Sequence, residues 1–266
     1  MILITGATDG IGLETAKQLA NLGHKLILHG RNADKAQRAC TAVMHAVPEA
    51  SLRPVSADLA DLASVARMAR ELSSSIIQLD VLINNAGVYM TQRKLSSDGF
   101  EMTLAVNHLA HFLLTIMLLP LLKKSTKPRV VTVSSMVHSS GRIEFGDMNG
   151  ERHFDGYGAY ANSKLANALF ARELARREPW LSSNYLHPGV IGTKLLHAAF
   201  SMPGASVAEG ARTSVYLASS PEVEGISGKY FNNCAAASPS PLVEDAQLAQ
   251  RLWEWSEHAV QPWLAA

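Results

Sequence analysis

The sequence predicts a single α/β domain over residues 1–266, in which helices cover both faces of a doubly wound parallel sheet of about seven strands. Short runs rich in β-branched residues alternate with longer segments of helical period, and this alternation calls for parallel strands joined by right-handed crossovers. Most of the runs lack an apolar–polar alternation, as expected of strands that are covered on both faces. With 266 residues, of which 47% are hydrophobic, the chain can build a sizeable core for such a domain.

The alternation of elements begins at the first residue. Strands are predicted at residues 1–5, 25–29, 52–56, 81–84, 129–134, 183–187 and 228–231. Helices are predicted at residues 11–22, 34–47, 62–74, 100–122, 159–177, 208–218 and 245–260. Two long loops, 136–158 and 193–206, each follow a strand at its carboxyl end, where open α/β sheets bind ligands. We expect the loop at about 193–206 to contact a substrate; the alternative is a surface excursion without such a contact.

Charge and cysteine content narrow the function classes. The formal net charge is +1, and no basic stripe is visible, so we expect no nucleic-acid partner. Cys40 and Cys234 lie far apart without a pairing pattern, which predicts neither a disulfide framework nor a metal site and suits a reducing compartment.

The most apolar stretch, residues 109–122, is interrupted by His111 and Pro120. We take it as too short for a membrane span and expect a buried helix. The chain opens with a strand pattern and shows no leader pattern, so we expect a cytoplasmic protein with no membrane partner.

A glycine-rich turn follows the first predicted strand and opens the first predicted helix. Its glycines allow a tight turn, a close approach of a pyrophosphate and close packing of helix on strand, and the helix amino terminus offers free N–H groups to phosphates. The residues expected to bind a dinucleotide here are Gly6, Thr8, Asp9, Gly10, Ile11 and Gly12. No Gly-Lys-Ser/Thr ending is present, which excludes a nucleotide-triphosphate P-loop. Asp9 could repel a phosphate or cap the helix, and we favour capping.

The ends of the second and third strands bear on which dinucleotide binds. A site selective for NAD needs a carboxylate after the second strand, and the sequence has Arg31 and Asn32 there. A guanidinium suits a 2′-phosphate, so we expect NADP (as NADPH) and consider NAD less favoured. Asp58 and Leu59 follow the third strand and are expected around the adenine, although Asp58 could instead cap the next helix.

Further motifs follow in order along the chain. They are Asn84-Asn85-Ala86-Gly87, Ser134-Ser135, Tyr160-Ala161-Asn162-Ser163-Lys164 and Pro188-Gly189-Val190. Together with the glycine-rich turn, this series resembles the classical short-chain dehydrogenase/reductase family over essentially the whole chain. Four stretches resemble its retinol dehydrogenase and protochlorophyllide reductase-like branch, and they are residues 107–112, 133–135 with 141–143, 160–167 and 252–257.

The resemblance implies a Rossmann-type fold in which Tyr160 exchanges a proton with the substrate oxygen and Lys164 hydrogen-bonds the nicotinamide ribose. The two residues lie four apart on a predicted helix, so both project from one face. We expect the adjacent ammonium to favour the phenolate and hence to lower the pKa of Tyr160. The catalytic serine would be Ser135, with Ser134 as the alternative if the strand register differs by one residue.

Asn107 would hold a water that links Lys164 to solvent, or else would be a buried amide satisfied by the backbone. The resemblance also implies that the cofactor groove and the nicotinamide side are lined by Asn84, Ala86, Gly87, Pro188, Gly189, Val190 and Thr193. His138 and His153 have no evident partner and are expected to face solvent. No metal-ligand spacing is found among the histidines.

These observations predict an NADP-dependent oxidoreductase acting on a carbonyl compound or an alcohol. The apolar residues of the second loop suggest an apolar or aromatic small molecule; they are Leu195, Leu196, Ala198, Ala199, Phe200 and Met202. The alternative is an NADP(H)-binding regulator or sensor with little turnover. By the same resemblance we expect a homo-oligomer, a dimer or tetramer, with contacts between the long helices predicted at 100–122 and 159–177.

Overall fold

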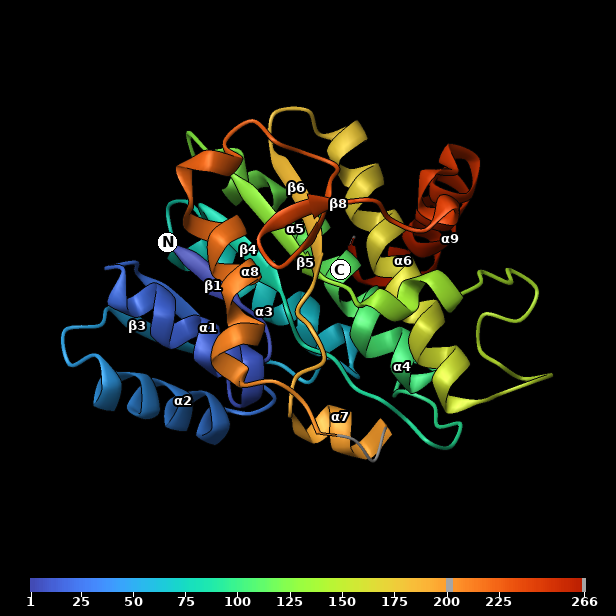
Figure 1. Cartoon of the computed structure of the whole chain (residues 1–266), viewed down its shortest axis with the longest axis horizontal. Coiled ribbons are helices and arrows are strands. Elements are labelled where there is room, and N and C mark those ends of the chain that lie inside the picture. The colour runs from blue at the N-terminus through green and yellow to red at the C-terminus, as the bar shows by residue number, and fades with distance from the viewer. Residues whose placement is uncertain (200–202, 265–266) are drawn as a thin grey trace.

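The computed structural model describes residues 1–199 and 203–264 (Figure 1). Within these residues, eight strands form one sheet in the order β3-β2-β1-β4-β5-β6-β7-β8. The strands are β1 (Ile2–Ile4), β2 (Leu26–Gly30), β3 (Leu52–Ser56), β4 (Val81–Asn84), β5 (Arg129–Val133), β6 (Ser182–His187), β7 (Tyr230–Asn232) and β8 (Ala235–Ala237). The first seven run parallel, which confirms the predicted sheet, and β8 pairs antiparallel with β7. Strand β8 was not predicted because its three exposed alanines carry no strand pattern.

Helices cover both faces of the sheet, as predicted. They are α1 (Gly10–Asn21), α2 (Ala33–Ala46), α3 (Leu62–Ser75), α4 (Met102–Leu104), α5 (Ala110–Leu122), α6 (Gly156–Arg177), α7 (Lys194–Ala199), α8 (Val207–Ser219) and α9 (Ala246–Leu264). Short turns of 3-10 helix lie at Met136–Ser140, Pro221–Val223 and Pro241–Glu244. Helices α1, α2 and α8 pack on one face, and α3, α5 and α6 pack on the other (Figure 1). Helix α7, which lies in the second long loop, was not predicted.

The first strand shows why the strand patterns are continuously apolar. Leu3 belongs to the core beneath α3 and α5, whereas Ile2 and Ile4 belong to the core beneath α1 and α8. Each of the three side chains is at most 1% exposed, so both faces of the strand require apolar residues. Because β1 lies between β2 and β4, the strand order reverses there, and the carboxyl ends of these strands open a crevice for a ligand.

The helix predicted at 100–122 is interrupted by one turn of π-helix over Ala105–Leu109, between α4 and α5. The whole run Met102–Leu122 is 21 residues long, longer than the stretch 109–122 singled out in the sequence, and by length and composition alone it could cross a membrane. However, 78% of its most apolar window is buried inside the fold, as in a core helix. Length and apolar composition therefore do not distinguish a span from a core helix here.

Helix α9 packs on α5 and α6, the two helices expected to form a contact between subunits. The Trp253 ring stacks on Phe170 with a centroid distance of 5.9 Å and meets the Phe112 ring edge-on at 4.9 Å. His108 Nε2 and Ser256 Oγ lie 2.7 Å apart at the same contact. Helix α9 thus covers part of α5 and α6 within the chain. The expected contact between subunits through these helices stays a prediction.

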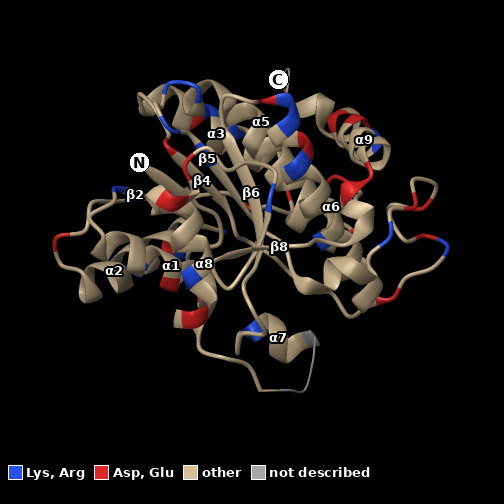
Figure 2. Cartoon of the chain, turned by 45° about the horizontal axis from the view of Figure 1, so that its top comes forward, with Lys and Arg blue, Asp and Glu red and all other residues tan. Residues whose placement is uncertain are grey.

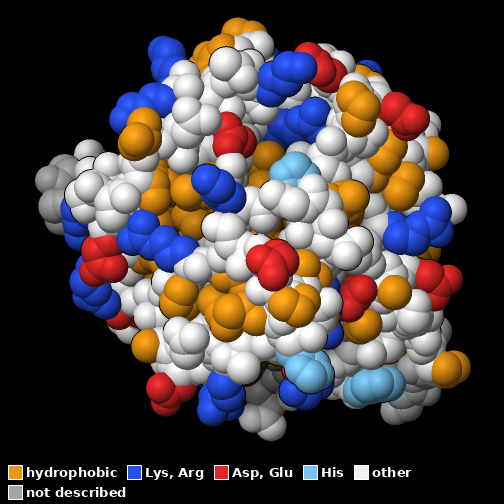
Figure 3. Space-filling model, turned by 90° about the vertical axis from the view of Figure 1, so that its left-hand side faces the viewer, with side chains coloured by type: hydrophobic (Ala, Val, Ile, Leu, Met, Phe, Trp, Pro, Cys, Tyr) orange, Lys and Arg blue, Asp and Glu red, His pale blue; other side chains and the backbone are white. Residues whose placement is uncertain are grey.

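Acidic and basic side chains are interspersed over the described surface in the views of Figures 2 and 3. The positive and negative side chains, whose charges nearly cancel, are therefore mixed in space as well as in sequence.

Candidate active site

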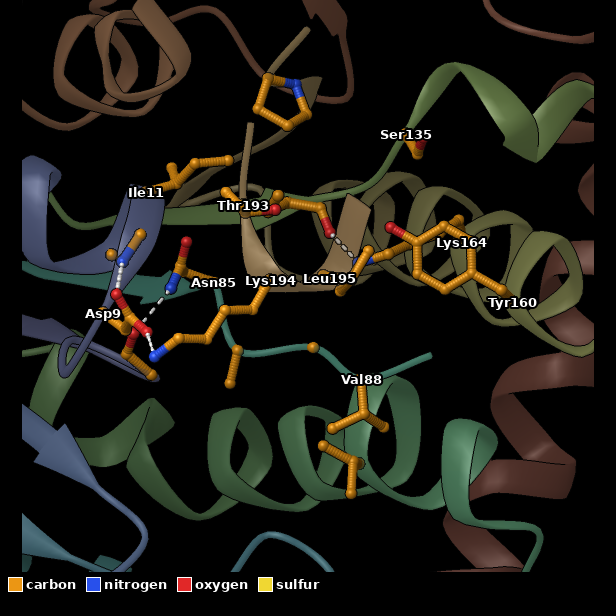
Figure 4. A pocket seen from close by; sticks show the side chains of 18 of the residues that line it. Asp9, Ile11, Asn85, Val88, Ser135, Tyr160, Lys164, Thr193, Lys194 and Leu195 are labelled. Atoms are coloured by element: carbon orange, nitrogen blue, oxygen red, sulfur yellow. Dashed lines mark hydrogen bonds and ion pairs between the residues drawn. The ribbon is translucent and has the colours of Figure 1, made fainter. Parts of the chain in front are cut away.

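A cavity of about 1030 Å³ lies at the carboxyl ends of the central strands (Figure 4). It collects most of the residues that the sequence indicated, which are Gly6, Thr8, Asp9, Gly10, Ile11, Gly12, Arg31, Asp58, Leu59, Ala86, Gly87, Ser135, Tyr160, Lys164, Pro188, Gly189, Val190 and Thr193. Motifs that are far apart in the chain therefore meet in one space, as expected at a topological switch point.

The glycine-rich turn forms the cofactor end of this cavity. Gly6 has φ of +64°, and a Cβ on Gly12 would lie only 2.3 Å from Gly6 O, so both positions exclude a side chain. Asp9 is the N-cap of α1 and accepts a hydrogen bond from Gly10 N at 2.8 Å, which confirms the predicted cap. The narrow glycine cradle at the start of a 12-residue helix fits the pyrophosphate of a dinucleotide.

Two cations line the cavity after β2. Arg31 was predicted there, and Lys35 in the first turn of α2 joins it. Asn32 is not among the residues that line the cavity; its side chain caps α2 and accepts from Lys35 N at 3.0 Å, and its contact with a cofactor stays a prediction. Lys35 was missed, although a second cation in the first turn of the helix after Arg31 was a usable signal.

Asp58 lines the cavity after β3. Its Oδ1 accepts from Ala60 N at 3.0 Å, whereas Asp61 caps α3 and accepts from Ser64 N. The alternative in which Asp58 caps the helix is therefore wrong, and its position beside Leu59 suits an adenine pocket.

Tyr160 and Lys164 lie on the face of α6 that borders the cavity (Figure 4). Asp155 caps this helix, which begins at Gly156 and so places both residues in its first half. Lys164 Nζ donates to Val133 O at 3.1 Å and lies 5.5 Å from the centroid of the Tyr160 ring. The ammonium and the phenol are thus neighbours at the carboxyl end of β5.

The pKa values of this pair are shifted differently from what the sequence suggested. Burial raises the pKa of the Tyr160 phenol above its usual value and lowers the pKa of Lys164 to about 8. The expected lowering of the pKa of Tyr160 by the ammonium is wrong for the protein alone, because loss of solvation outweighs the attraction at this buried position. The phenol is therefore protonated at neutral pH and can act as a proton donor.

The two serines after β5 have different partners. Ser134 Oγ donates to Lys164 O at 2.7 Å and is buried beneath α6. Ser135 is 9% exposed at the cavity and its Oγ accepts from Val137 N at 3.4 Å. Ser135 therefore remains able to donate its proton into the cavity, as the favoured register requires.

The asparagines after β4 are placed differently from the prediction. Asn84 does not line the cavity; it is buried, and its Nδ2 donates to Thr115 Oγ1 at 3.0 Å, so its predicted role as a groove residue is wrong. Asn85 lines the cavity instead, and its Nδ2 donates to Thr5 O at 2.7 Å. A shift of one residue moves a side chain to the other side of the strand end, which the sequence motif does not specify.

Asn107, in the π-helical turn, is fully buried and satisfied by protein groups. Its Oδ1 accepts from Val88 N at 2.8 Å, and its Nδ2 donates to Val88 O and to Ser163 Oγ, both at 3.0 Å. The side chain matches the alternative of a satisfied buried amide and is outside the cavity lining.

Two histidines near the cavity were not assigned correctly. His138 is 3% exposed; its Nδ1 donates to Ser135 O at 2.6 Å and its Nε2 accepts from Ser240 N at 3.0 Å. The expectation that it faces solvent is wrong, because its partner Ser240 is 102 residues away in sequence. His153 is exposed, as expected. His187, at the end of β6, lines the cavity and was not singled out.

The second long loop contributes apolar contacts to the cavity. Leu195 and Leu196 of α7 line it together with Met90 and Val137, so this loop borders the cavity, and its contact with a substrate stays a prediction. Phe200 and Met202 lie outside the described residues. The cavity lining therefore combines the cations after β2 with apolar side chains, among them those of α7.

The fold and the site together define a dinucleotide-dependent oxidoreductase, in which a buried tyrosine and lysine face a groove suited to a nicotinamide cofactor. Comparison with known families matches residues 1–204 to the short chain dehydrogenase family, and the chain belongs to this family.

Individual relatives agree with this assignment. The chain is 41% identical over 288 residues to retinol dehydrogenase 14 of Homo sapiens, covering 96% of this chain and 84% of that protein. It is 40% identical over 271 residues to polyprenol dehydrogenase of Mus musculus, covering 94% and 81%. A crystal structure of a short chain dehydrogenase from Escherichia coli CFT073 complexed with NADPH superposes with a TM-score of 0.74 at 28% identity, covering 88% of this chain and 96% of that one.

Proposed function

We propose that the protein transfers a hydride between NADP(H) and an apolar alcohol or the corresponding carbonyl compound. The observation that carries this proposal is the meeting of Ser135, Tyr160 and Lys164 in one cavity whose far end holds Arg31 and Lys35. A hydride acceptor near the phenol would then also be near a nicotinamide held by the glycine-rich turn.

The bound dinucleotide would supply the hydride in the reducing direction. Ser135 donates a hydrogen bond to the substrate oxygen and stabilises the negative charge that develops there. Tyr160, which burial keeps protonated, gives its proton to that oxygen. Lys164 stabilises the resulting phenolate, because its ammonium lies beside the ring. In the oxidising direction the same groups reverse their roles.

The preference for NADP rests on charge. Arg31 and Lys35 line the cavity after β2, and that strand end offers no carboxylate to bind a ribose 2′-hydroxyl. A planar guanidinium and a flexible ammonium can together neutralise a 2′-phosphate. The NADPH complex of the structurally similar bacterial enzyme supports the same choice.

The choice of an apolar substrate rests on the other end of the cavity. Met90, Val137, Leu195 and Leu196 form apolar walls there. A substrate with a long hydrocarbon part would bury its apolar surface against them. The names of the relatives, which refer to retinol and polyprenol, point to the same chemical class.

The test is a steady-state assay with purified protein. Oxidation of NADPH is followed with all-trans-retinal, a polyprenal and a small polar aldehyde, and reduction of NADP with the matching alcohols. We expect turnover with the apolar compounds and a fall in kcat of about 100-fold or more in Tyr160→Phe, with the Kd of NADPH within about threefold of wild type. Tight NADPH binding without turnover of any substrate, unchanged in Tyr160→Phe, would instead support a regulator or sensor.

A further inference from the structure

His111, in the first turn of α5, connects two motifs that lie more than one hundred residues apart. Its Nε2 is 2.9 Å from Thr5 Oγ1, and its Nδ1 is 3.0 Å from Asn107 O. The side chain is 1% exposed, so neither nitrogen has water as an alternative partner. Thr5 directly precedes the glycine-rich turn, and Asn107 lies in the π-helical turn.

The partners define the tautomer of His111. A carbonyl oxygen can only accept, so Nδ1 carries the proton and donates to Asn107 O. Burial lowers the pKa of His111 to about 3, and the nearby Lys164 charge acts in the same direction, so the ring is neutral at physiological pH. Nε2 of this neutral ring is therefore an acceptor, and the Thr5 hydroxyl donates to it.

The Thr5 hydroxyl is itself fully used. Its oxygen accepts from Asn85 N at 2.9 Å and from Ala86 N at 3.0 Å, so both its lone pairs are occupied. Its proton has two acceptors in reach, His111 Nε2 at 2.9 Å and the more distant Ile83 O at 3.3 Å, and the shorter contact favours His111. The hydroxyl thereby connects the end of β1 to the segment after β4. Gly6 and Asn85 on these two segments line the cofactor end of the cavity.

Asn107 connects His111 to the part of the cavity that contains Lys164. Its amide holds Val88 at both N and O. The preceding residue, Gly87, lies between two groups: Asn107 Oδ1 and Lys164 Nζ are each 3.5 Å from where its Cβ would be. A displacement of the π-helical turn would therefore change the wall against which Lys164 packs.

We propose that His111 is a positioning residue. Through one donor and one acceptor it couples the glycine-rich turn to the π-helical turn of Asn107, and so fixes the cofactor-binding turn relative to Lys164. This inference rests on the proposed function, since it assigns His111 to the geometry of that site. His111 lies outside the cavity lining, so it acts through Thr5 and Asn107 rather than by direct contact with a bound molecule.

Two substitutions separate its two hydrogen bonds. In His111→Asn, the side-chain amide can occupy the place of Nδ1 and donate to Asn107 O, but it cannot reach Thr5. In His111→Gln, the longer amide can accept from Thr5 at the place of Nε2 and loses the bond to Asn107 O. We expect His111→Asn to raise the Kd of NADPH about tenfold with little change in kcat, and His111→Gln to lower kcat about tenfold with little change in Kd.

His108→Asn is the matched control. His108 lies three residues earlier and is also 1% exposed; it is bonded to Ser256 of α9 and to Asn167, and none of these three residues lines the cavity. We expect this variant to lower the midpoint of thermal unfolding without changing the Kd of NADPH or kcat. The proposal is overturned if both His111 variants behave like His108→Asn. It is also overturned if, in each variant, the Kd of NADPH rises and kcat falls by the same factor.

A double-mutant cycle tests the coupling by cofactor binding alone. Thr5→Val removes the hydroxyl from the other side, and we expect Thr5→Val with His111→Asn to bind NADPH no more weakly than Thr5→Val alone. Multiplicative losses of affinity would overturn the coupling. NADPH binding is measured by fluorescence titration, so this cycle tests His111 even if the wild-type protein turns over none of the substrates. Such a lack of turnover would count against the proposed function alone.

Discussion

Lys194 Nζ forms an ion pair with Asp9 Oδ2, which connects helix α7 to the glycine-rich turn across the mouth of the cavity (Figure 4). The two residues are 185 positions apart in sequence. The hydrogen bond from Lys194 is the main cause of the lowered pKa of the Asp9 carboxyl, so the carboxylate is ionised at neutral pH. Both side chains are largely exposed, and the pair therefore contributes little to folding stability. Its main effect is to neutralise an acid close to the expected phosphate site.

Removal of Lys194 should therefore weaken cofactor binding. In Lys194→Met, the uncompensated Asp9 carboxylate repels the phosphates, and we expect the Kd of NADPH to rise about threefold to tenfold at low salt. Asp9→Asn, which can retain the cap, should restore the affinity of the Lys194→Met protein. Lys127→Met, at the exposed pair with Glu224, is the control. An unchanged Kd in Lys194→Met, measured by nicotinamide fluorescence, would contradict this role.

The two serines after β5 should respond differently to truncation. Ser135→Ala removes the donor to the substrate oxygen, so we expect kcat to fall about 100-fold. Ser134→Ala removes the bond to Lys164 O, and we expect the free energy of unfolding to fall by about 1 kcal/mol with a smaller change in kcat. Steady-state kinetics and urea unfolding of both variants measure the contrast. A larger loss of kcat in Ser134→Ala would mean that the serines have exchanged roles.

Burial of Lys164 should make stability depend on pH. Its pKa falls from 10.5 to about 8 on folding, so between these values the unfolded chain holds a proton that the folded chain has released. The free energy of unfolding therefore rises with pH in this window. Between pH 7 and about 9.5, we expect wild type to gain about 2 kcal/mol relative to Lys164→Met, which lacks this titration. Urea unfolding at both pH values measures the difference, and parallel changes in the two proteins would refute it.

The cations after β2 should determine the choice of dinucleotide. In Arg31→Asp, a carboxylate replaces a guanidinium at the expected 2′-phosphate, and we expect the ratio of kcat/KM for NADPH over NADH to fall about 100-fold or more. Lys35→Ala should lower the same ratio by about tenfold or less, because Arg31 remains. Arg38→Ala, further along α2 and outside the cavity lining, is the control. An unchanged ratio in Arg31→Asp would count against the NADP assignment.

The aromatic contact of α9 should be important for stability. Trp253 is 6% exposed between Phe112 and Phe170, so Trp253→Ala should lower the free energy of unfolding by about 3–5 kcal/mol. Trp255→Ala, at a half-buried ring, should lower the free energy of unfolding by less.

Sedimentation velocity of the wild-type protein tests the expected homo-oligomer. A monomer at micromolar concentration would mean that α9, rather than a second subunit, completes the packing of α5 and α6.

Local pattern was sufficient for the order of the elements and for the cofactor turn. The seven parallel strands follow from apolar runs that both faces of a covered sheet require, and the turn at Gly6, Gly10 and Gly12 follows from backbone conformations and close approaches that a side chain would block. The spacing of Tyr160 and Lys164 on one helix predicted that they share a face. Each of these features depends on residues close together in the chain.

Only the tertiary structure decided which side chains enter the cavity and which support it. Asn85 rather than Asn84 lines the cavity, because neighbouring residues at a strand end point to different sides. Ser134 and Ser135 both line it, but the hydroxyl of Ser134 is bonded to Lys164 O, which no local pattern specifies. Contacts such as His111 with Thr5, 106 residues apart, depend on the packing of separate elements. The sequence therefore determined the periodic and steric features, whereas long-range hydrogen bonds, whose partners have no fixed spacing, were decided when the chain folded.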